Sequence, residues 1–521
     1  MRTTRLLPLV AGLLLTVTAI PSEAAPRFAG SPACDTRAKV AGLDLQTATA
    51  ADLQAAMRAG RLTSVRLVDA YLARIKAYDA KTNSIRALHP KARAEAARLD
   101  AERRAGKVRG PLHGIPLLLK DNIGTKDLPT TAGSIALEGS VPFQDSTVVA
   151  RLRAAGAIVL GKANLSEWAN WVDLSMPNGY SSLGGQVLSA YDFGDPLGSS
   201  SGSGVAGSMA FATGTFGSET SGSILSPASV NGLVGIKPTR GLVSRSGVIP
   251  LAEGFDTAGP MTRTVADAAA LLTAVAGPDA ADNATSDAPA GVDFAAAART
   301  GSLNGVRLGF SAQRRDGLGG PAREVYDAAL DTLRAQGAVL VETEELEDLG
   351  QLGIAEIGLI PNDFKAHLDA YLTTAIPTPK SGVRSLVDVV AYNQQFPDKV
   401  KYGQRLLIAS AAQPGVRELA QAGSLGLRTA MGEVIDRALE ADDLDAVVVH
   451  GPAYANVGAS AGYPTVIVPA GLVNDEDPVG LSFLGSRYAD RALVGYASAY
   501  ERASRKRVPP TRVNDEIIPG C

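Results

Sequence analysis

The chain has 521 residues, 50 Lys and Arg against 53 Asp and Glu, four His and two Cys, and 45% of its residues are hydrophobic. This apolar content and a net charge of −3 exclude a wholly disordered chain and argue against nucleic acid as the main partner. The dispersed His and Cys residues form no cluster with zinc spacing, and the length allows several domains or one large α/β domain.

The N-terminus carries the pattern of a secretory signal peptide. Two arginines among the first five residues precede an apolar run over residues 6–20, and small residues follow up to Ala25. The run is shorter than the roughly 20 residues that span a bilayer, and neither twin arginines nor a cysteine suited to lipidation accompany it. We therefore expect residues 1–25 to be removed and the mature protein, residues 26–521, to be secreted and free of the membrane.

Export changes the meaning of the two cysteines, because an oxidising compartment permits disulfides. Cys34 and Cys521 stand near opposite ends of the mature chain. Termini of compact domains often lie close together, so a bridge between these residues would fasten two ends that otherwise fray. The sequence leaves the distance between the sulfurs open, and two free thiols on the tails are the alternative.

The mature chain is expected to begin with two helices. Thr49 and Asp52 have the spacing of a capping box, which predicts a helix that ends at Gly60. Ser64 is expected to cap a second helix, whose apolar residues recur on one face as far as Ile75.

Short apolar runs then alternate with helical stretches. Strands are expected at residues 115–119, 157–160, 306–310, 339–341, 446–449 and 465–468, and helices at residues 146–155, after Pro321 and at residues 490–502. Residues 278–296, rich in Asp, Ala and Pro, are expected to form a surface loop. The alternation predicts an α/β sheet covered by helices.

Residues 194–247 form a block with 12 Gly and 12 Ser in 54 positions. A flexible linker of that composition would lack apolar residues, whereas this block contains them throughout, including Phe211, Ile224 and Ile236. We interpret the block as an ordered segment whose glycines allow tight turns and close approach of the backbone to a ligand.

Two short motifs match other enzyme classes. Residues 156–163 fit the phosphate-binding pattern G-x-x-x-x-G-K, but Ala163 replaces the hydroxyl residue that binds magnesium and the interior is a predicted strand. Residues 198–202 fit the nucleophile elbow G-x-S-x-G with Ser200 at its centre. That elbow would need His450 as its base, so an α/β-hydrolase esterase using Ser200 and His450 is an alternative.

A third pattern needs no histidine. Lys120 follows the apolar strand predicted at residues 115–119, an unusual place for a solvated charge. Burial lowers the pKa of a lysine, and a lysine that is neutral near pH 7 can act as a general base. Downstream lie the serines 199–201 and Ser223, whose neighbouring glycines allow consecutive backbone N–H groups to face one site. A base, a relay hydroxyl and a nucleophile in such a loop are sufficient for acyl transfer.

These segments resemble the amidase signature family over most of the mature chain. The matching motifs are Leu112-His-Gly-Ile-Pro-Leu-Leu-Leu-Lys-Asp-Asn-Ile123, Gly161-Lys-Ala-Asn-Leu-Ser-Glu-Trp168, Gly198-Ser-Ser-Ser-Gly-Ser203 and Asn231-Gly-Leu-Val-Gly-Ile-Lys-Pro-Thr239. The resemblance implies a single large α/β domain with a mixed central β-sheet flanked by helices. It implies neither a metal nor a cofactor.

The resemblance also implies roles for individual residues. Carried over position by position, the family's Ser-Ser-Lys triad falls on Ser223 as nucleophile, Ser199 as relay serine with a cis peptide bond, and Lys120 as base. The oxyanion hole would consist of the backbone amides of Thr220, Ser221, Gly222 and Ser223. Because the working base must be neutral, activity is expected to rise towards mildly alkaline pH.

Two departures from the common family pattern bear on the substrate. Leu225 stands where many relatives have an arginine that could pair with a substrate carboxylate, and Ser221 stands where many have Asp or Gly. The pattern is most similar to the peptide amidases, which remove the C-terminal amide of peptides. Aryl-acylamide and fatty or aliphatic amide hydrolases are alternatives within the family, and a catalytically dead amide-binding protein is another. The signal peptide argues against an amidotransferase subunit.

No motif marks the acyl pocket. The variable region 349–426 is expected to be mostly helical and to supply some pocket residues, with Trp168, Trp171 and Tyr180 as further candidates. Aromatic residues are by default more often part of a core. The protein is expected to act as a monomer or homodimer on a small-molecule or peptide amide.

Overall fold

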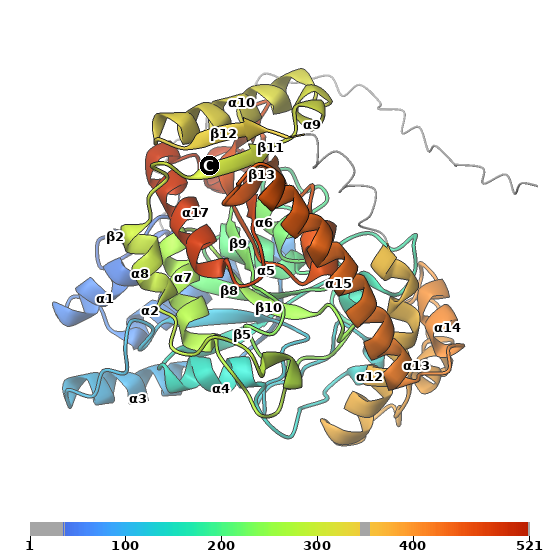
Figure 1. Ribbon diagram of the computed structural model, residues 1–521. Helices are drawn as coiled ribbons and strands as arrows, with labels where there is room; N and C mark the ends of the chain where they lie inside the picture. The colour runs from blue at the N-terminus through green and yellow to red at the C-terminus, as the bar shows by residue number, and fades with distance from the viewer. Residues whose placement is uncertain (1–34, 36, 344–354, 519–521) are drawn as a thin grey trace, which may run out of the picture.

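A mixed sheet of eleven strands runs through the molecule (Figure 1). In this computed structural model the described residues are 35, 37–343 and 355–518. From one edge to the other the strands are β12 (Val339–Glu342), β11 (Arg307–Phe310), β13 (Ala446–His450), β15 (Asp477–Leu484), β14 (Thr465–Val473), β9 (Val234–Lys237), β10 (Thr257–Thr262), β8 (Gly214–Glu219), β4 (Pro116–Lys120), β5 (Ile158–Ala163) and β3 (Ile85–Leu88).

Both kinds of strand pairing occur in this sheet. β4 is parallel to β5 and β8, and β11 is parallel to β12 and β13, whereas the other neighbours are antiparallel. Two further pairs lie outside it: β1 (Lys39–Val40) with β2 (Leu43–Asp44), and β6 (Tyr180–Ser181) with β7 (Gly185–Gln186). The predicted fold class, one α/β domain with a mixed central sheet, is confirmed.

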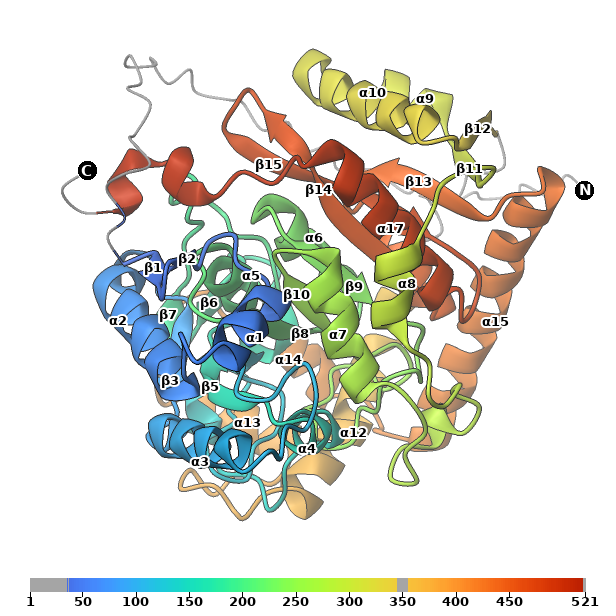
Figure 2. The same ribbon diagram turned by 90° about the vertical axis from the view of Figure 1, so that its left-hand side faces the viewer.

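Helices cover both faces of the sheet. They are α1 (Ala50–Arg58), α2 (Ser64–Thr82), α3 (Ala92–Arg104), α4 (Thr147–Ala154), α5 (Ser201–Ser208), α6 (Leu225–Val230), α7 (Val265–Val275), α8 (Phe294–Thr300), α9 (Ala312–Asp316), α10 (Gly320–Ala335), α12 (Ile360–Thr374), α13 (Leu386–Asn393), α14 (Arg405–Ala411), α15 (Arg417–Ala441), α16 (Ala455–Ala461) and α17 (Asp490–Ser504). Figure 2 shows α7, α8 and α17 side by side over one face. Among the helices of the described residues, none is both long and apolar enough to cross a membrane.

The strand β14 shows how the two faces are filled. Val466 and Val468 belong to the largest core, which includes apolar residues of α17 such as Leu493. Ile467, between them, packs in a separate core with Ile224 beside α6. Successive side chains of a strand point to opposite faces, so a continuous apolar run is what a strand covered on both sides requires.

The predicted elements are found with shifted ends. Thr49 and Asp52 form the predicted capping box of α1. The cap predicted at Ser64 is wrong by one residue, because the Thr63 side chain accepts the N–H of Arg66 and Ser64 already lies in α2. The chain also does not begin with helices, since the β1–β2 hairpin precedes α1 and turns at residues 41–42, both of which have positive φ. Positive φ at both central turn residues is typical of two-residue hairpins.

The Gly/Ser block is ordered, as interpreted. Residues 194–247 contain α5, β8, α6 and β9, and most of their side chains are buried. The predicted surface loop at residues 278–296 is partly helical, because a 3-10 turn at Asn283–Thr285 and the start of α8 lie within it. In the variable region, residues 355–426 form the helices α12, α13, α14 and the first part of α15, which sit beside the sheet (Figure 1).

Cys34, Cys521 and the signal segment 1–25 lie outside the described residues, so the bridge stays a prediction. The nearest described parts of both ends contact the same helix, α2. Asp35 Oδ2 lies 2.7 Å from Arg74 Nη1, and the Glu516 carbonyl accepts a hydrogen bond from Lys81 Nζ. Arg74 and Lys81 are two turns apart, about 10 Å along the helix axis.

If the chain is exported as its sequence predicts, we expect a disulfide between Cys34 and Cys521. Peptide mapping without reductant should yield one linked pair of terminal peptides and no free thiol. Changing Cys521 to Ser is expected to lower the free energy of unfolding by about 2–4 kcal/mol, because a closed loop restricts the unfolded chain. Two alkylated cysteines in the unreduced protein would contradict the prediction.

Candidate active site

The position of Lys120 follows from the sheet. β4 and β8 are parallel neighbours, with Leu119 opposite Phe216, so both strands end at the same edge of the sheet. Lys120 is the last residue of β4, and Glu219 is the last residue of β8. The Lys120 side chain is fully buried at this edge, beside the loop that follows β8.

Three oxygen atoms surround the Lys120 amine. Lys120 Nζ lies 2.8 Å from Ser199 Oγ, 3.0 Å from Ser218 Oγ and 3.1 Å from the Ser218 carbonyl oxygen. Asn122 Nδ2 donates to the same Ser218 hydroxyl at 2.8 Å. Burial lowers the pKa of Lys120 to about 7, against the opposing effect of the Asp256 and Glu219 carboxylates.

This geometry can accommodate a neutral lysine. A neutral amine has two N–H donors and one lone pair, and Ser218 offers two acceptors. When both N–H groups bond to Ser218, the lone pair is left for the Ser199 hydroxyl. Lys120 can therefore accept a proton from Ser199 near pH 7.

Replacing Ser218 by Ala is expected to lower kcat about 10- to 100-fold, because it removes one of the two acceptors that orient the Lys120 amine. Steady-state kinetics on an amide substrate would measure the loss. Asn122→Ala is the matched control, because it removes a donor to the Ser218 hydroxyl and leaves both bonds from Lys120 in place. Equal losses in the two variants would contradict the assigned role of Ser218.

Ser199 is held at the end of a tight segment that precedes α5. The peptide bond between Gly198 and Ser199 is cis, as the resemblance implies. The Ser199 carbonyl accepts the Ser166 N–H at 3.1 Å. A Cβ at Gly198 would lie 2.5 Å from Ser166 Oγ, so the close approach of these two segments requires glycine there.

Ser223 lies in the loop between β8 and α6. Its carbonyl accepts the Ser200 N–H at 3.2 Å, which joins this loop to the segment that carries Ser199. The Ser223 side chain is 8% exposed, and its hydroxyl makes no hydrogen bond within the described residues. The structure thus brings Lys120 and Ser199 into direct contact and ties Ser223 to them through the backbone.

Residues 220–223, the predicted oxyanion loop, present three unpartnered amides. In the part of the chain that the structure describes, the N–H groups of Thr220, Ser221 and Ser223 donate no hydrogen bond. The Gly222 N–H instead faces the Glu219 carboxylate. Gly222 has a φ of +81°, which side-chain-bearing residues rarely adopt. Three of the four predicted donors are therefore available to an oxyanion.

Buried carboxylates that the sequence did not single out surround this loop. Glu219 Oε2 accepts the N–H groups of Ile224 and Leu225 at 2.7 and 3.0 Å. Asp256 accepts the Thr220 hydroxyl, and burial raises its pKa to about 6. Asp256 lies 36 residues from Thr220 and carries no sequence signal of this contact.

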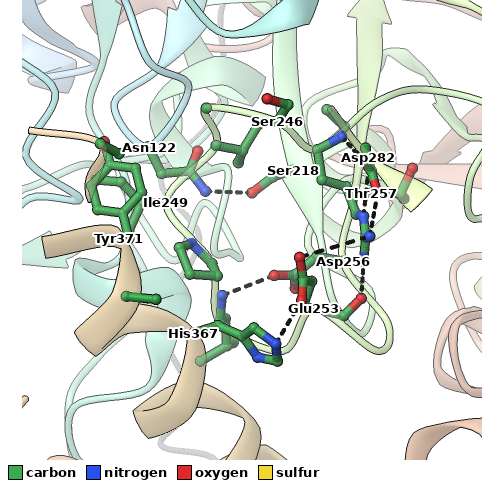
Figure 3. Close-up of a pocket in the computed structure, with 18 of the residues that line it drawn as sticks. Asn122, Ser218, Ser246, Ile249, Glu253, Asp256, Thr257, Asp282, His367 and Tyr371 are labelled. Carbon is green, nitrogen blue, oxygen red and sulfur yellow. Dashed lines mark hydrogen bonds and ion pairs between the residues drawn. The ribbon is translucent and has the colours of Figure 1, made fainter. Parts of the chain in front are cut away.

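A cavity of about 270 Å³ adjoins the Lys120 network (Figure 3). Asn122, Ser218 and Thr220 line one part of it. His367 lines another part, with Nε2 2.6 Å from Glu253 and Nδ1 2.6 Å from Asp363. Its bonds to these carboxylates raise the pKa of His367 to about 9 against the effect of burial, so a charged cluster faces this cavity.

The aromatic candidates for the acyl pocket are core residues. Trp168, Trp171 and Tyr180 are buried in a second core beside the sheet, together with Phe364 of α12. Trp171 Nε1 donates to Ser410 Oγ, and the Tyr180 hydroxyl donates to the Lys399 carbonyl. These bonds fix the helical region 355–426 onto the rest of the domain.

The structure does not support an esterase built on Ser200 and His450. The Ser200 hydroxyl donates to the Ser218 carbonyl at 3.1 Å, within β8. His450 ends β13, and four strands separate β13 from β8, which places it roughly 24 Å away across the sheet. The phosphate-loop motif at residues 156–163 is likewise the buried strand β5. Among residues 35, 37–343 and 355–518, no group of three His, Cys, Asp or Glu side chains could hold a metal ion.

Comparisons with known proteins agree on one family. The family model Amidase matches residues 66–447. A probable amidase of Arabidopsis thaliana is 39% identical over 482 residues, covering 89% of this chain and 92% of the relative. The native peptide amidase of Stenotrophomonas maltophilia superimposes with a TM-score of 0.84 at 44% identity, covering 89% of this chain and 98% of that one. A glutamyl-tRNA(Gln) amidotransferase subunit of Streptomyces coelicolor is 32% identical over 491 residues, covering 88% of this chain and 96% of the relative.

Proposed function

This chain belongs to the amidase signature family and is an amide-hydrolysing enzyme, and on that premise we propose that it is a secreted peptide amidase. Such an enzyme hydrolyses the C-terminal carboxamide of a peptide and releases ammonia. The observation that carries the proposal is the 2.8 Å contact between the buried Lys120 amine and the Ser199 hydroxyl, beside the loop of Ser223.

The proposed reaction proceeds through an acyl-serine. Ser223 Oγ attacks the carboxamide carbon while its proton passes to Ser199 Oγ and the Ser199 proton passes to Lys120 Nζ. Amides of the oxyanion loop bind the negative oxygen. The same relay then protonates the leaving nitrogen, the C–N bond breaks and ammonia departs. Water then attacks the acyl carbon with the same proton transfers, which frees the peptide acid and restores Ser223.

The preference for a peptide amide rests on two observations. The chain is 44% identical to a peptide amidase and 32% identical to the amidotransferase relative. Leu225 is fully buried among apolar residues just after the nucleophile, so this position offers no charge for a substrate carboxylate. A peptide amide has no carboxylate at its reacting end, so it needs no positive charge at this position.

Secretion is supported by the basic and apolar pattern of residues 1–25. Amino-terminal sequencing of protein from the culture medium should begin near residue 26. Protein found only inside cells with residues 1–25 intact would refute secretion and would leave the proposed amidase activity unaffected.

One assay tests the substrate class. Ammonia or amine release is measured from a neutral peptide amide, a fatty or simple aliphatic amide and an aryl acylamide of matched acyl group. The highest kcat/KM is expected for the peptide amide. A higher kcat/KM for the fatty amide or the anilide would assign the enzyme to one of those alternatives instead.

A further inference from the structure

We propose that Glu356 is a positioning residue that holds the oxyanion loop in its working conformation through Ser221, an inference that rests on the proposed function. Ser221 Oγ donates to Glu356 Oε1 at 2.7 Å, and Ser460 Oγ donates to Glu356 Oε2 at 2.7 Å. Glu356 lies just before α12, and Ser460 lies in α16. The Glu356 carboxylate therefore joins its own segment to those of Ser221 and Ser460, which lie 135 and 104 residues away in the sequence.

Because Glu356 is buried, its two hydrogen bonds hold the local backbone in place. The Glu356 side chain is 1% exposed, so water does not replace a lost partner. Hydrogen bonds to a carboxylate are shorter and stronger than those between neutral groups, and both contacts have the expected length. Loss of the Ser221 contact would leave a buried acceptor unpaired and would free the side chain that anchors the centre of the loop.

The anchored residue sits next to the reacting group. Ser221 offers one of the three unpartnered amides, and it immediately precedes Gly222, whose positive φ turns the chain towards Ser223. Thr220 is held in the same way by Asp256. Within the described residues, both loop hydroxyls other than that of Ser223 are thus bound by buried carboxylates, and the Ser223 hydroxyl is left free to react.

Glu356 itself does not belong to the triad. The contacts that the structure gives its carboxylate are to Ser221 and Ser460, and neither is Lys120, Ser199 or Ser223. Glu356 must therefore affect catalysis by orienting the backbone N–H groups of the oxyanion loop. Those amides act on the oxyanion, which is present in the transition state and absent in the bound substrate, so the effect belongs in kcat rather than in KM.

Glu356→Ala is expected to lower kcat for a peptide amide about 10- to 100-fold, with KM changed by less than about 3-fold. Glu356→Gln is expected to stay within about 3-fold of the unmodified enzyme, because the amide keeps a hydrogen-bonding group of the same size between the two hydroxyls. Ser221→Ala should lower kcat to the same extent as Glu356→Ala, and the double variant should lose no more than either single one, as expected for groups acting as one unit.

The matched control is Asp490→Ala. Asp490 is also a buried carboxylate that binds a hydroxyl and an N–H, both of Thr239, and it has no contact with the oxyanion loop. This variant should lose thermal stability while kcat per titrated active site stays unchanged. Active-site titration by the burst of released product corrects every variant for unfolded protein.

Three outcomes would overturn the proposal: an unchanged kcat in Ser221→Ala, losses in the two single variants that add in the double variant, or a kcat in Glu356→Gln as low as in Glu356→Ala. If Glu356→Ala does not fold, Ser221→Ala and Glu356→Gln decide the question alone. If another amide is the preferred substrate, the peptide-amidase proposal fails, and the same variants on that amide still test Glu356.

Discussion

Replacing Ser223 by Ala is expected to lower kcat for a peptide amide by about 10⁴-fold or more, because the attacking oxygen is removed. Binding and the loop amides remain, so KM should change little and residual turnover should stay above the uncatalysed rate. The hydroxyl makes no hydrogen bond within the described residues, so the folded state should lose little stability. Ammonia release and thermal unfolding, measured on the same preparation, would check both expectations.

Ser200→Ala is the control for this experiment. The Ser200 hydroxyl is bound to the backbone of Ser218, so its removal is expected to affect packing and to leave most of the activity. The esterase alternative requires the opposite order of losses. Full activity in Ser223→Ala would reject the triad.

Replacing Lys120 by Met is expected to lower kcat/KM about 10³-fold or more at pH 8, because Lys120 is the only titratable side chain that the described residues place in hydrogen-bond contact with Ser199 Oγ. In the unmodified enzyme kcat/KM should rise as pH passes through about 7, where Lys120 loses its proton, and level off above. The rising limb should disappear in Lys120→Met. A profile of the unmodified enzyme that falls above pH 7 would argue against Lys120 as the base.

The same lysine should also make the free energy of unfolding depend on pH. Burial lowers the folded-state pKa from 10.5 to about 7, so between these values the unfolded chain binds more protons than the folded one. The free energy of unfolding therefore gains a contribution that rises with pH from about 7 to 10.5. Lys120→Met should lack this contribution and should be more stable than the unmodified enzyme below pH 7.

Lys162→Met is the matched control for both measurements. Lys162 is also fully buried, in the neighbouring strand β5, and burial lowers its pKa to about 8. Its amine bonds to the Ile123 carbonyl and to Thr130 Oγ1, away from Ser199. This variant should change stability and leave the rise of kcat/KM near pH 7 in place.

Those parts of the site that a few consecutive residues define could be predicted from the sequence. Lys120 ends an apolar strand and is fully buried, and Gly222, directly before Ser223, has a positive φ. Both signals are visible along a few consecutive residues. Six of the eleven strands, β4, β5, β11, β12, β13 and β14, could be predicted from their continuous apolar runs, whereas β3, β8, β9, β10 and β15 have no such prediction.

The rest depends on contacts between distant segments. Asp100 accepts the N–H groups of Ser64 and Val65 at the start of α2, a contact across 36 residues that accompanies the shift of the cap to Thr63. Asp256 and Glu356 reach the oxyanion loop from 36 and 135 residues away. No periodicity or motif marks such carboxylates before the chain is folded.

The strand order has a consequence for the order in which the molecule can be completed. β14 and β15 come from residues 465–484, yet they lie between β9 and β13 near the middle of the sheet. Until this late segment is synthesised, the edges of β9 and β13 have no partner, and such edges are templates for pairing with other chains. Shortened chains that end before Thr465 should therefore aggregate rather than form a smaller active enzyme.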